Sequence, residues 1–303
     1  MRSDYDIIDR KLVRVDREGP IILIVCPSEE ERRYLIDEWK IDEHTLLSAL
    51  DPDELSRLEF EPEHLAIIFK RPRNYSVKDE FIFKVSSIGS FIFKDKLVVV
   101  TSEDIPIFDG ITLNRPFSPT YLTLKLIYRS IYHFLEHLKI ISTISDELQT
   151  KINTSMENRH LINLFTLEKS LVYYLSSISA NGALIDKIKI NASKIGLQVE
   201  EQELIDDIQV ENNQCYKQAE VYSNILASLM DARASIVSNN LNVLIKTLNI
   251  ITIAIMVPTF VVSAFSMNVK IPLATLEHAF WIIMCLALIS VVAFLAFWRY
   301  RRW

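Results

Sequence analysis

Two long uncharged hydrophobic segments near the C-terminus constrain the fold of this chain more than any other feature. No Asp, Glu, Lys or Arg occurs between Lys246 and Lys270, and none occurs between Glu277 and Arg299. A helix needs about 20 apolar residues to cross the roughly 30 Å hydrocarbon core of a bilayer. Both segments reach that length, so we expect the chain to cross a membrane twice. We place a first span, an external loop and a second span at residues 243–267, 268–277 and 278–298.

The charged residues indicate where the rest of the chain lies. The 303 residues include 33 Lys and Arg against 39 Asp and Glu, and this acidic balance argues against nucleic acid and suits divalent cations. The first ten residues are polar and lack the apolar region of a signal peptide. Lys246 precedes the first span, and a basic tail at 299–303 follows the second. Because positive residues mark the cytoplasmic face, we expect spans in the plasma (inner) membrane and both termini in the cytoplasm.

Residues 1–117 indicate a cytosolic α/β domain. Short segments rich in Ile, Val and Phe, such as Ile21–Val25, are typical of strands. Ser28, which precedes three glutamates, indicates a helix start, and we place turns at Gly89 and at residues 94–96. The region therefore predicts a small mixed sheet covered by helices. It has no glycine-rich phosphate loop, no paired Cys or His ligands and no nucleophile motif, so we expect neither an enzyme nor an organic cofactor.

The sequence becomes helical at Ser118. Ser118 is a suitable N-cap and Pro119 a suitable first helical residue. Apolar residues then recur at helical spacing over a stretch too long for one ordinary helix. We therefore predict an antiparallel cytosolic helix pair over 118–196, with a turn near 153–158 and a second helix that ends at Asn181–Gly182.

A second long helical stretch follows. Neither Gly nor Pro occurs between Gly196 and Pro258, and these roughly 60 residues would span about 90 Å as a helix. Apolar residues recur about every three and a half positions, so a helix of this length must pack against other helices. We predict a stalk helix over 197–242 that continues without a break into the first span.

The first span carries a polar stripe at heptad spacing. Six of its eight residues are polar, and on a helix all eight fall within about 120°. A polar stripe inside lipid is costly unless it faces protein or water. Two interpretations stay open: the stripe mediates packing between helices, or several copies of the span surround a pore with the apolar second span outside. The stripe consists of Asn242, Ile245, Asn249, Thr252, Met256, Thr259, Ser263 and Ser266.

The stripe offers carboxamides and hydroxyls but no carboxylate. Mg²⁺ dehydrates reluctantly, and neutral oxygens can hydrogen-bond to a hydrated ion without trapping it. Ile245, Leu248 and Met256 would form apolar constrictions that close by dewetting. The candidate pore-lining residues are Asn242, Ile245, Asn249, Thr252, Met256, Thr259 and Ser263.

The junction between the two spans resembles the CorA family of magnesium channels. The tripeptide Ser266-Met267-Asn268 follows Met256-Val257-Pro258-Thr259-Phe260 and stands where that family has Gly-Met-Asn. Residues 229–242 and 167–173 also resemble the helices of that family. The resemblance implies a homopentamer with a funnel of cytosolic domains, and Mg²⁺ as the transported and regulatory ion. It also implies that Ser266, Met267 and Asn268 capture the hydrated ion at the outer mouth.

The resemblance further implies a cytosolic Mg²⁺ sensor. Six acidic residues and no basic ones lie between Glu200 and Glu211. Acidic groups that face each other between neighbouring domains repel, and a bound cation relieves that repulsion and favours the closed state. A solvated acidic helix face is the alternative. The candidate regulatory metal ligands are Glu203, Asp206, Asp207 and Asp231.

Two other functions fit the same pattern less well. A zinc or other-cation transporter on this fold would normally use His, Cys or carboxylate ligands, and the stripe has none. A non-conducting, membrane-anchored scaffold or sensor does not need a polar stripe. The partners that we expect are therefore divalent cations, membrane lipid and further copies of the chain.

Overall fold

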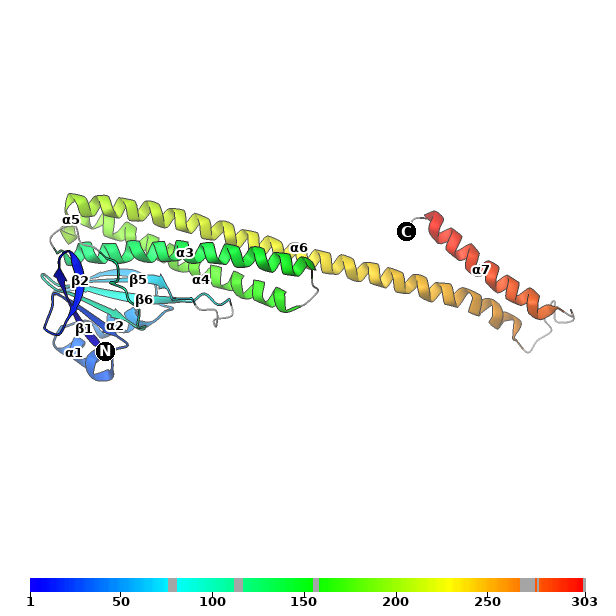
Figure 1. Ribbon diagram of the computed structural model, residues 1–303, viewed down its shortest axis with the longest axis horizontal. Coiled ribbons are helices and arrows are strands. Elements are labelled where there is room, and N and C mark those ends of the chain that lie inside the picture. Colours follow the sequence, from blue (N-terminus) through cyan, green and yellow to red (C-terminus); the bar gives the residue numbers. More distant parts are fainter. Residues whose placement is uncertain (76–80, 112–116, 155–157, 268–275, 277, 302–303) are drawn as a thin grey trace. The chain divides into compact units, whose positions relative to one another are not determined.

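The computed structural model describes residues 1–75, 81–111, 117–154, 158–267, 276 and 278–301. The chain divides into two compact units, Met1–Met230 and Asp231–Trp303, whose elements are labelled in Figure 1. One long helix, α6, contributes residues to both units.

The first unit contains a seven-stranded mixed sheet. The strand order is β2-β1-β3-β7-β6-β5-β4, and β3 and β7 run parallel while the other neighbours are antiparallel. The mixed sheet confirms the predicted α/β class, although three polar strands, β1, β2 and β4, lack the apolar signature that the sequence analysis required. The strands are β1 (Arg2–Ile8), β2 (Lys11–Val15), β3 (Ile21–Val25), β4 (Arg57–Phe60), β5 (Leu65–Pro72), β6 (Val85–Ile92) and β7 (Leu97–Thr101).

Helices cover both faces of this sheet (Figure 1). Successive side chains of a strand point to opposite faces, and β3 buries both sets. Ile21 and Leu23 join the core formed with the long helices, whereas Ile22 and Ile24 join a second core with α1 (Glu29–Asp37) and α2 (Glu43–Leu50). This two-sided burial explains why β3 is uniformly apolar.

The predicted helix start at Ser28 is confirmed. The Ser28 hydroxyl accepts a hydrogen bond from the Glu31 backbone N–H at 3.2 Å, and the Glu31 carboxylate accepts one from the Ser28 backbone N–H at 2.9 Å. This reciprocal capping box satisfies two backbone donors that a helix N-terminus otherwise leaves unpaired.

Gly89 lies inside β6, so the turn predicted there is wrong. It pairs with Ile68 on β5 and Val100 on β7. A Cβ atom at Gly89 would lie 2.5 Å from the Cβ of Ala49 in α2. The glycine therefore lets α2 approach the middle of the sheet. The turn predicted at residues 94–96 does join β6 to β7.

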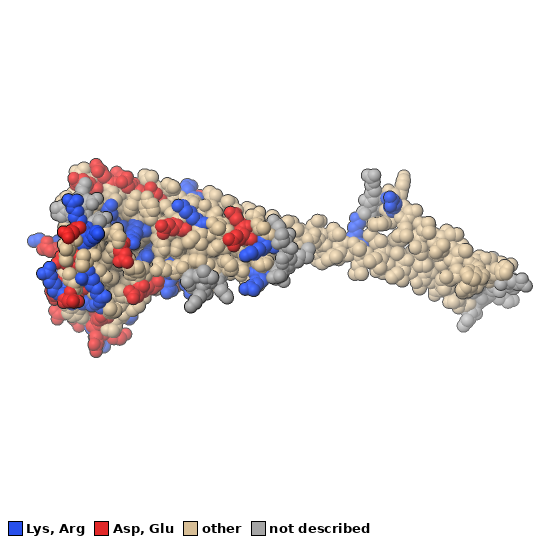
Figure 2. All heavy atoms as spheres, viewed as in Figure 1, with Lys and Arg blue, Asp and Glu red and all other residues tan. Residues whose placement is uncertain are grey.

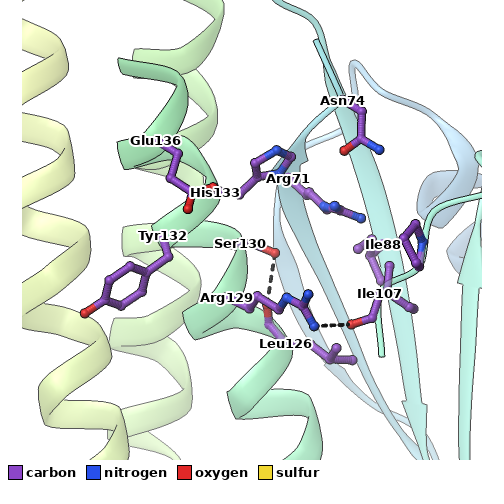
Figure 3. A pocket seen from close by; sticks show the side chains of 11 residues that line it. Arg71, Asn74, Ile88, Ile107, Leu126, Arg129, Ser130, Tyr132, His133 and Glu136 are labelled. Atoms are coloured by element: carbon purple, nitrogen blue, oxygen red, sulfur yellow. Dashed lines mark hydrogen bonds between the residues drawn. The ribbon is translucent and has the colours of Figure 1, made fainter. Parts of the chain in front are cut away.

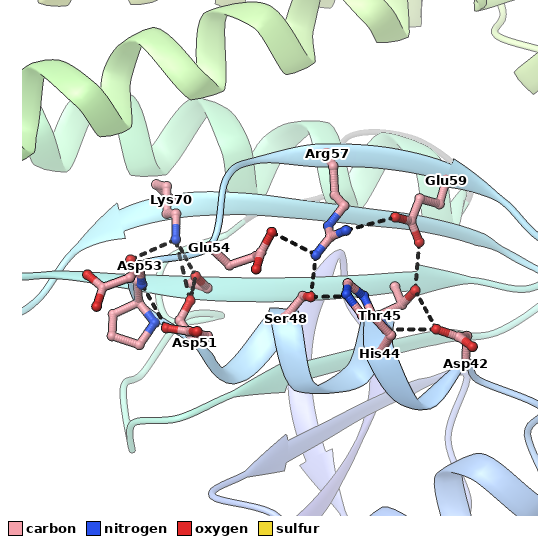
Figure 4. Close-up of polar contacts among 12 residues, drawn as sticks. Asp42, His44, Thr45, Ser48, Asp51, Asp53, Glu54, Arg57, Glu59 and Lys70 are labelled. Carbon is pink, nitrogen blue, oxygen red and sulfur yellow. Dashed lines mark hydrogen bonds and ion pairs between the residues drawn. The ribbon is translucent and has the colours of Figure 1, made fainter.

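A buried lysine joins α2 to the sheet (Figure 4). Lys70 on β5 is 3% exposed, and its Nζ donates to the carbonyl oxygens of Pro52 at 2.8 Å and Asp51 at 3.4 Å, and to the Ser87 hydroxyl at 2.7 Å. Burial lowers the pKa of Lys70 to about 8. The ammonium group lies just past the C-terminus of α2, where a helix favours positive charge.

Three long helices complete the first unit: α3 (Pro119–Thr154), α4 (Asn158–Ile190) and the first part of α6 (Val199–Phe265), with a short α5 (Ala192–Ile195) before α6. The Ser118 hydroxyl caps α3 by accepting from the Tyr121 N–H at 3.2 Å, and it donates to Glu201 of α6 at 2.8 Å. Between α3 and α4, His137 Nδ1 and the Tyr174 hydroxyl are 2.6 Å apart in the core. Polar contacts thus fix the register of these helices within an apolar interface.

Helix α4 continues to Ile190, so the predicted end at Asn181–Gly182 is wrong. Asn181 is fully buried, and its carboxamide bonds both backbone groups of Lys70. A Cβ atom at Gly182 would lie 3.0 Å from Nδ2 of Asn212 in α6. The pair that resembles a helix terminus is therefore used for contacts, because Asn181 attaches the helix to β5 and Gly182 lets α6 come close.

Candidate functional site

The second unit exposes two apolar helices. The C-terminal part of α6 and helix α7 (Ala279–Arg301) are both long and apolar enough to cross a membrane, with mean hydropathies of 2.1 and 2.8. In the most apolar 18-residue segment of each helix, 0% of the α6 residues and 6% of the α7 residues are buried within the chain. Few charged atoms appear over these helices in Figure 2, in contrast to the first unit. So large an exposed apolar surface needs lipid or other chains to cover it.

The polar stripe lies on α6 and is exposed along its whole length. Each of the eight stripe residues, from Asn242 to Ser266, is exposed in the single chain. The Thr252 hydroxyl donates to the Leu248 carbonyl oxygen at 2.9 Å, and the Thr259 hydroxyl donates to the Ile255 carbonyl oxygen at 2.7 Å. Because each hydroxyl proton is used inside the helix, the oxygen lone pairs remain available as acceptors.

The N-terminal half of the stripe borders a cavity shared with α7. Asn242, Ile245 and Asn249 line a space of about 570 Å³ together with Lys246, and α7 supplies three aromatic side chains. These aromatic residues are Phe294, Phe297 and Trp298. Their spacing of three and four places these aromatic residues on one helix face, but no sequence pattern connects them with the stripe.

The described part of the tripeptide follows the end of α6. The Ser266 N–H and hydroxyl both donate to the Ser263 carbonyl oxygen, at 3.2 and 3.1 Å, and Met267 is exposed. Asn268 lies outside the described residues, as does the predicted external loop at 268–277 apart from residue 276. The first two positions of the predicted ion-capture site are therefore located directly after the last turn of the striped helix.

The four predicted regulatory acids all lie on α6. Glu203, Asp206 and Asp207 are exposed on the first unit, and Asp231 begins the second unit. Asp206 forms an ion pair with Lys189 of α4 at 2.7 Å, so part of its charge is compensated within the chain. Among the described residues, no three His, Cys, Asp or Glu side chains come together as a metal site.

One acid of the same cluster has a structural role. Glu201 is buried, and its carboxylate accepts from the Ser118 hydroxyl at 2.8 Å and from the Gln198 N–H at 3.0 Å. It therefore holds the start of α3 against the start of α6. The charge pattern alone did not separate this residue from its exposed neighbours.

Together these features define an integral membrane protein with two candidate spans, in which a polar-striped helix continues into an α/β unit. The sequence pattern of the CorA-like Mg²⁺ transporter proteins matches residues 23–302. The chain belongs to this CorA family.

Individual relatives are similar to almost the whole of this chain in sequence and in structure. The cobalt/magnesium transport protein CorA of Methanocaldococcus jannaschii is 26% identical over 314 residues, which cover 99% of this chain and 97% of that protein. The complete structure of the CorA magnesium transporter from the same organism aligns with a TM-score of 0.82 at 22% identity, covering 98% of this chain and 96% of that one. The full-length CmaX protein aligns with a TM-score of 0.68 at 17% identity, covering 100% and 97%. These similarities confirm the predicted architecture of an α/β unit, long helices and two apolar C-terminal helices.

Proposed function

We propose that this chain forms a membrane channel for divalent cations, with Mg²⁺ as the main ion and Co²⁺ or Ni²⁺ as further candidates. The observation that carries the proposal is the exposed polar stripe on an otherwise apolar helix, in a chain of the CorA family. The M. jannaschii relative is a cobalt/magnesium transport protein, which supports the choice of ions.

The stripe suits an ion that keeps its water shell. Hydrated Mg²⁺ presents water hydrogens outward, so a favourable lining consists of hydrogen-bond acceptors. Thr252 and Thr259 provide lone pairs because their protons are bonded inside the helix, and the amides of Asn242 and Asn249 provide carbonyl oxygens. Neutral acceptors hold such an ion weakly enough to release it.

A pore requires several copies of the chain, because each copy contributes one striped helix. We propose a homopentamer in which α6 lines the pore and α7 faces lipid, in the plasma (inner) membrane with both termini in the cytoplasm. Lys246 and Trp298 line the same cavity, so the start of the first span lies beside the end of the second. The basic residues Lys246 and Arg299 therefore belong to one end of the hairpin, as a cytoplasmic end requires.

The direct test is ion flux into liposomes that contain the purified protein, with Mg²⁺, Co²⁺ and Zn²⁺ compared. We expect Mg²⁺ flux, and wild-type protein that conducts none of these ions would refute the proposal. Thr252→Val should reduce Mg²⁺ flux severalfold because it replaces a stripe acceptor with a methyl group. Thr247→Val is the matched control, since Thr247 makes the same bond to its own helix at 2.9 Å but lies outside the stripe. Equal effects of the two variants would contradict a role for the stripe.

A second test asks whether Asn249 faces water or α7. In liposomes, a water-soluble thiol reagent should block flux through Asn249→Cys if this side chain lines the pore. The exposed cysteines Cys26 and Cys285 are first replaced, whereas Cys215 is buried. Complete protection of Asn249→Cys would assign it to the cavity shared with α7 and would exclude it from the pore lining.

At the outer mouth we propose that Ser266, Met267 and Asn268 capture the hydrated ion. Asn268→Ala should abolish Mg²⁺ uptake while the oligomer, measured by light scattering in detergent, stays intact. Undiminished uptake by this variant would refute the capture role.

We further propose that intracellular Mg²⁺ binds between neighbouring cytosolic units and closes the channel. Of the four candidate acids, Glu203, Asp207 and Asp231 are preferred, because Asp206 already pairs with Lys189. Asp207→Asn should raise the intracellular Mg²⁺ concentration needed for closure, and Asp206→Asn is the matched control with a smaller expected effect. Unchanged closure in Asp207→Asn would leave the acidic cluster as a solvated helix face.

A further inference from the structure

A pocket between α3 and the sheet brings two arginine side chains together. It encloses about 330 Å³, enough for roughly ten waters at about 30 Å³ each. Arg71 reaches it from β5 and Arg129 from α3, as Figure 3 shows. Ile88, Leu126 and Ile107 form an apolar wall, while Asn74 and Ser130 add neutral polar groups.

Neither arginine forms an ion pair with a carboxylate among the described residues, although the charge of Glu103 acts on Arg71. Arg129 Nη1 donates to the backbone carbonyl oxygens of Ile107, at 3.3 Å, and Asp109. The Nη1 atom of Arg71 is buried, and it has no hydrogen-bond partner in the described part of the chain. The nearby Glu103 is engaged by Arg73. A half-buried guanidinium with one buried, unbonded nitrogen is unfavourable beside a second positive group, unless an anion joins them.

The positive charge of the pocket comes from these two arginines. Burial, together with the neighbouring His137, Arg71 and Arg129, lowers the pKa of His133 to about 3, so this imidazole is neutral at pH 7. Burial and the charge of Arg129 also lower the pKa of Arg71, to about 10. Among the described residues, Glu136 is the one carboxylate that lines the pocket, and its side chain is exposed. The described lining of the pocket therefore carries two guanidinium groups against one exposed carboxylate.

We propose that this pocket binds a small phosphate-bearing anion held between Arg71 and Arg129. A planar guanidinium fork matches phosphate oxygens with two parallel hydrogen bonds. The two arginines approach from different elements, and a tetrahedral phosphate offers oxygens in several directions, whereas a carboxylate offers two in one plane. Asn74 and Ser130 line the same space, and the apolar wall leaves room for a short organic group. The volume limits the ligand to a small one.

The test is calorimetric titration of the full-length protein in detergent, in Mg²⁺-free buffer at pH 7, with inorganic pyrophosphate as the probe. Arg71→Gln and Arg129→Gln should each weaken binding about tenfold or more, as expected for a lost charge-assisted hydrogen bond. Lys125→Gln removes the same charge one turn from Arg129 but does not line the pocket, so it should weaken binding less than about threefold. A parallel titration with a water-soluble short-chain phosphatidic acid distinguishes a lipid headgroup from a free phosphate, because the true source should bind more tightly.

A separate variant covers the case in which the arginine variants do not fold. Asn74→Asp places a carboxylate at an exposed position of the pocket, and it should also weaken pyrophosphate binding about tenfold. Absence of pyrophosphate binding to the wild type would overturn the proposal. So would equal weakening by Lys125→Gln and Arg71→Gln, or unchanged affinity in Asn74→Asp. None of these outcomes bears on Mg²⁺ flux, which is measured separately in liposomes.

Discussion

Replacing Asn181 with leucine tests how α4 is attached to the sheet. Strand β4 begins at Arg57, which pairs with Ile68 of β5, so β4 does not pair with Lys70. The outer edge of β5 is therefore open at Lys70. The Asn181 carboxamide pairs with this edge as a neighbouring strand would. Its Oδ1 accepts from the Lys70 N–H at 2.8 Å, and its Nδ2 donates to the Lys70 carbonyl oxygen at 2.8 Å. Oδ1 also accepts from the Ser56 hydroxyl at 2.8 Å.

The size of the destabilisation follows from the backbone groups that lose their hydrogen-bond partners. Leucine has a similar size but neither donates nor accepts, so the N–H and the carbonyl of Lys70 would both be left unpaired. Asn181 is 0% exposed, which keeps water from replacing the bonds. Each unsatisfied buried group costs about 1–3 kcal/mol, so Asn181→Leu should lower the free energy of unfolding by about 4 kcal/mol.

Urea denaturation of the full-length protein in detergent measures this loss. With a denaturant slope of about 2–3 kcal/mol per molar, the urea midpoint should fall by roughly 1.3–2 M. Hydrogen exchange adds a local readout, because the Lys70 amide should exchange faster in Asn181→Leu. Asn191→Leu is the matched control, since Asn191 donates one local bond to the Lys187 carbonyl at 2.8 Å at an exposed site, and its effect should stay below about 0.5 kcal/mol.

Comparison of the two variants tests whether the Asn181 carboxamide replaces a neighbouring strand. If Asn181→Leu and Asn191→Leu shift the urea midpoint equally, the carboxamide does not act as a substitute strand edge. Unchanged exchange at Lys70 would contradict the bond geometry directly, even if the global stability fell.

Three further predictions concern the same unit. The free energy of unfolding should rise by about 3 kcal/mol between pH 8 and 10.5, because folded Lys70 has lost a proton that the unfolded chain still holds. Urea titrations of wild type and Lys70→Met at each pH should isolate this rise as the difference between their free energies of unfolding. A difference that does not change with pH would contradict the prediction. Gly182→Val should lower the free energy of unfolding by about 1–3 kcal/mol, measured by the urea midpoint, because its Cβ would crowd Asn212. Glu201→Ala should lower it by about 2 kcal/mol and speed exchange at the start of α3, because the Ser118 hydroxyl loses its acceptor; Glu203→Ala, at an exposed position, is the control.

Local rules account for the elements that the sequence predicted correctly. The capping box at Ser28 depends on residues three apart, and the apolar run of β3 is legible because both of its faces are buried. The same rules failed at Gly89 and at Asn181–Gly182. Within its own segment, each of these glycines resembles a turn or a helix end. Only the tertiary contacts, Ala49 against Gly89 and Asn212 against Gly182, show that the glycine allows a helix to come close.

The candidate site divides in the same way. The spans and the stripe are periodic patterns within a single helix, so they can be recognised without knowing any tertiary contact. The burial of Glu201, the pairing of Asp206 with Lys189 and the convergence of Arg71 with Arg129 join residues from different elements. No spacing rule connects such residues, because the sheet order and the helix register determine which of them meet.

The sequence alone thus determined that the chain has two candidate spans, a stripe of neutral acceptors on the first of them and the marks of the CorA family, because hydrophobic length and helical periodicity are properties of one contiguous segment. The tertiary structure decided which polar groups are compensated. The ammonium group of Lys70 lies at the C-terminus of α2, and the Asn181 carboxamide bonds the edge of β5. The guanidinium groups of Arg71 and Arg129 line one pocket. Those outcomes depend on burial and on partners distant in the chain, and the cost of an unpaired buried group is set only when the elements pack together.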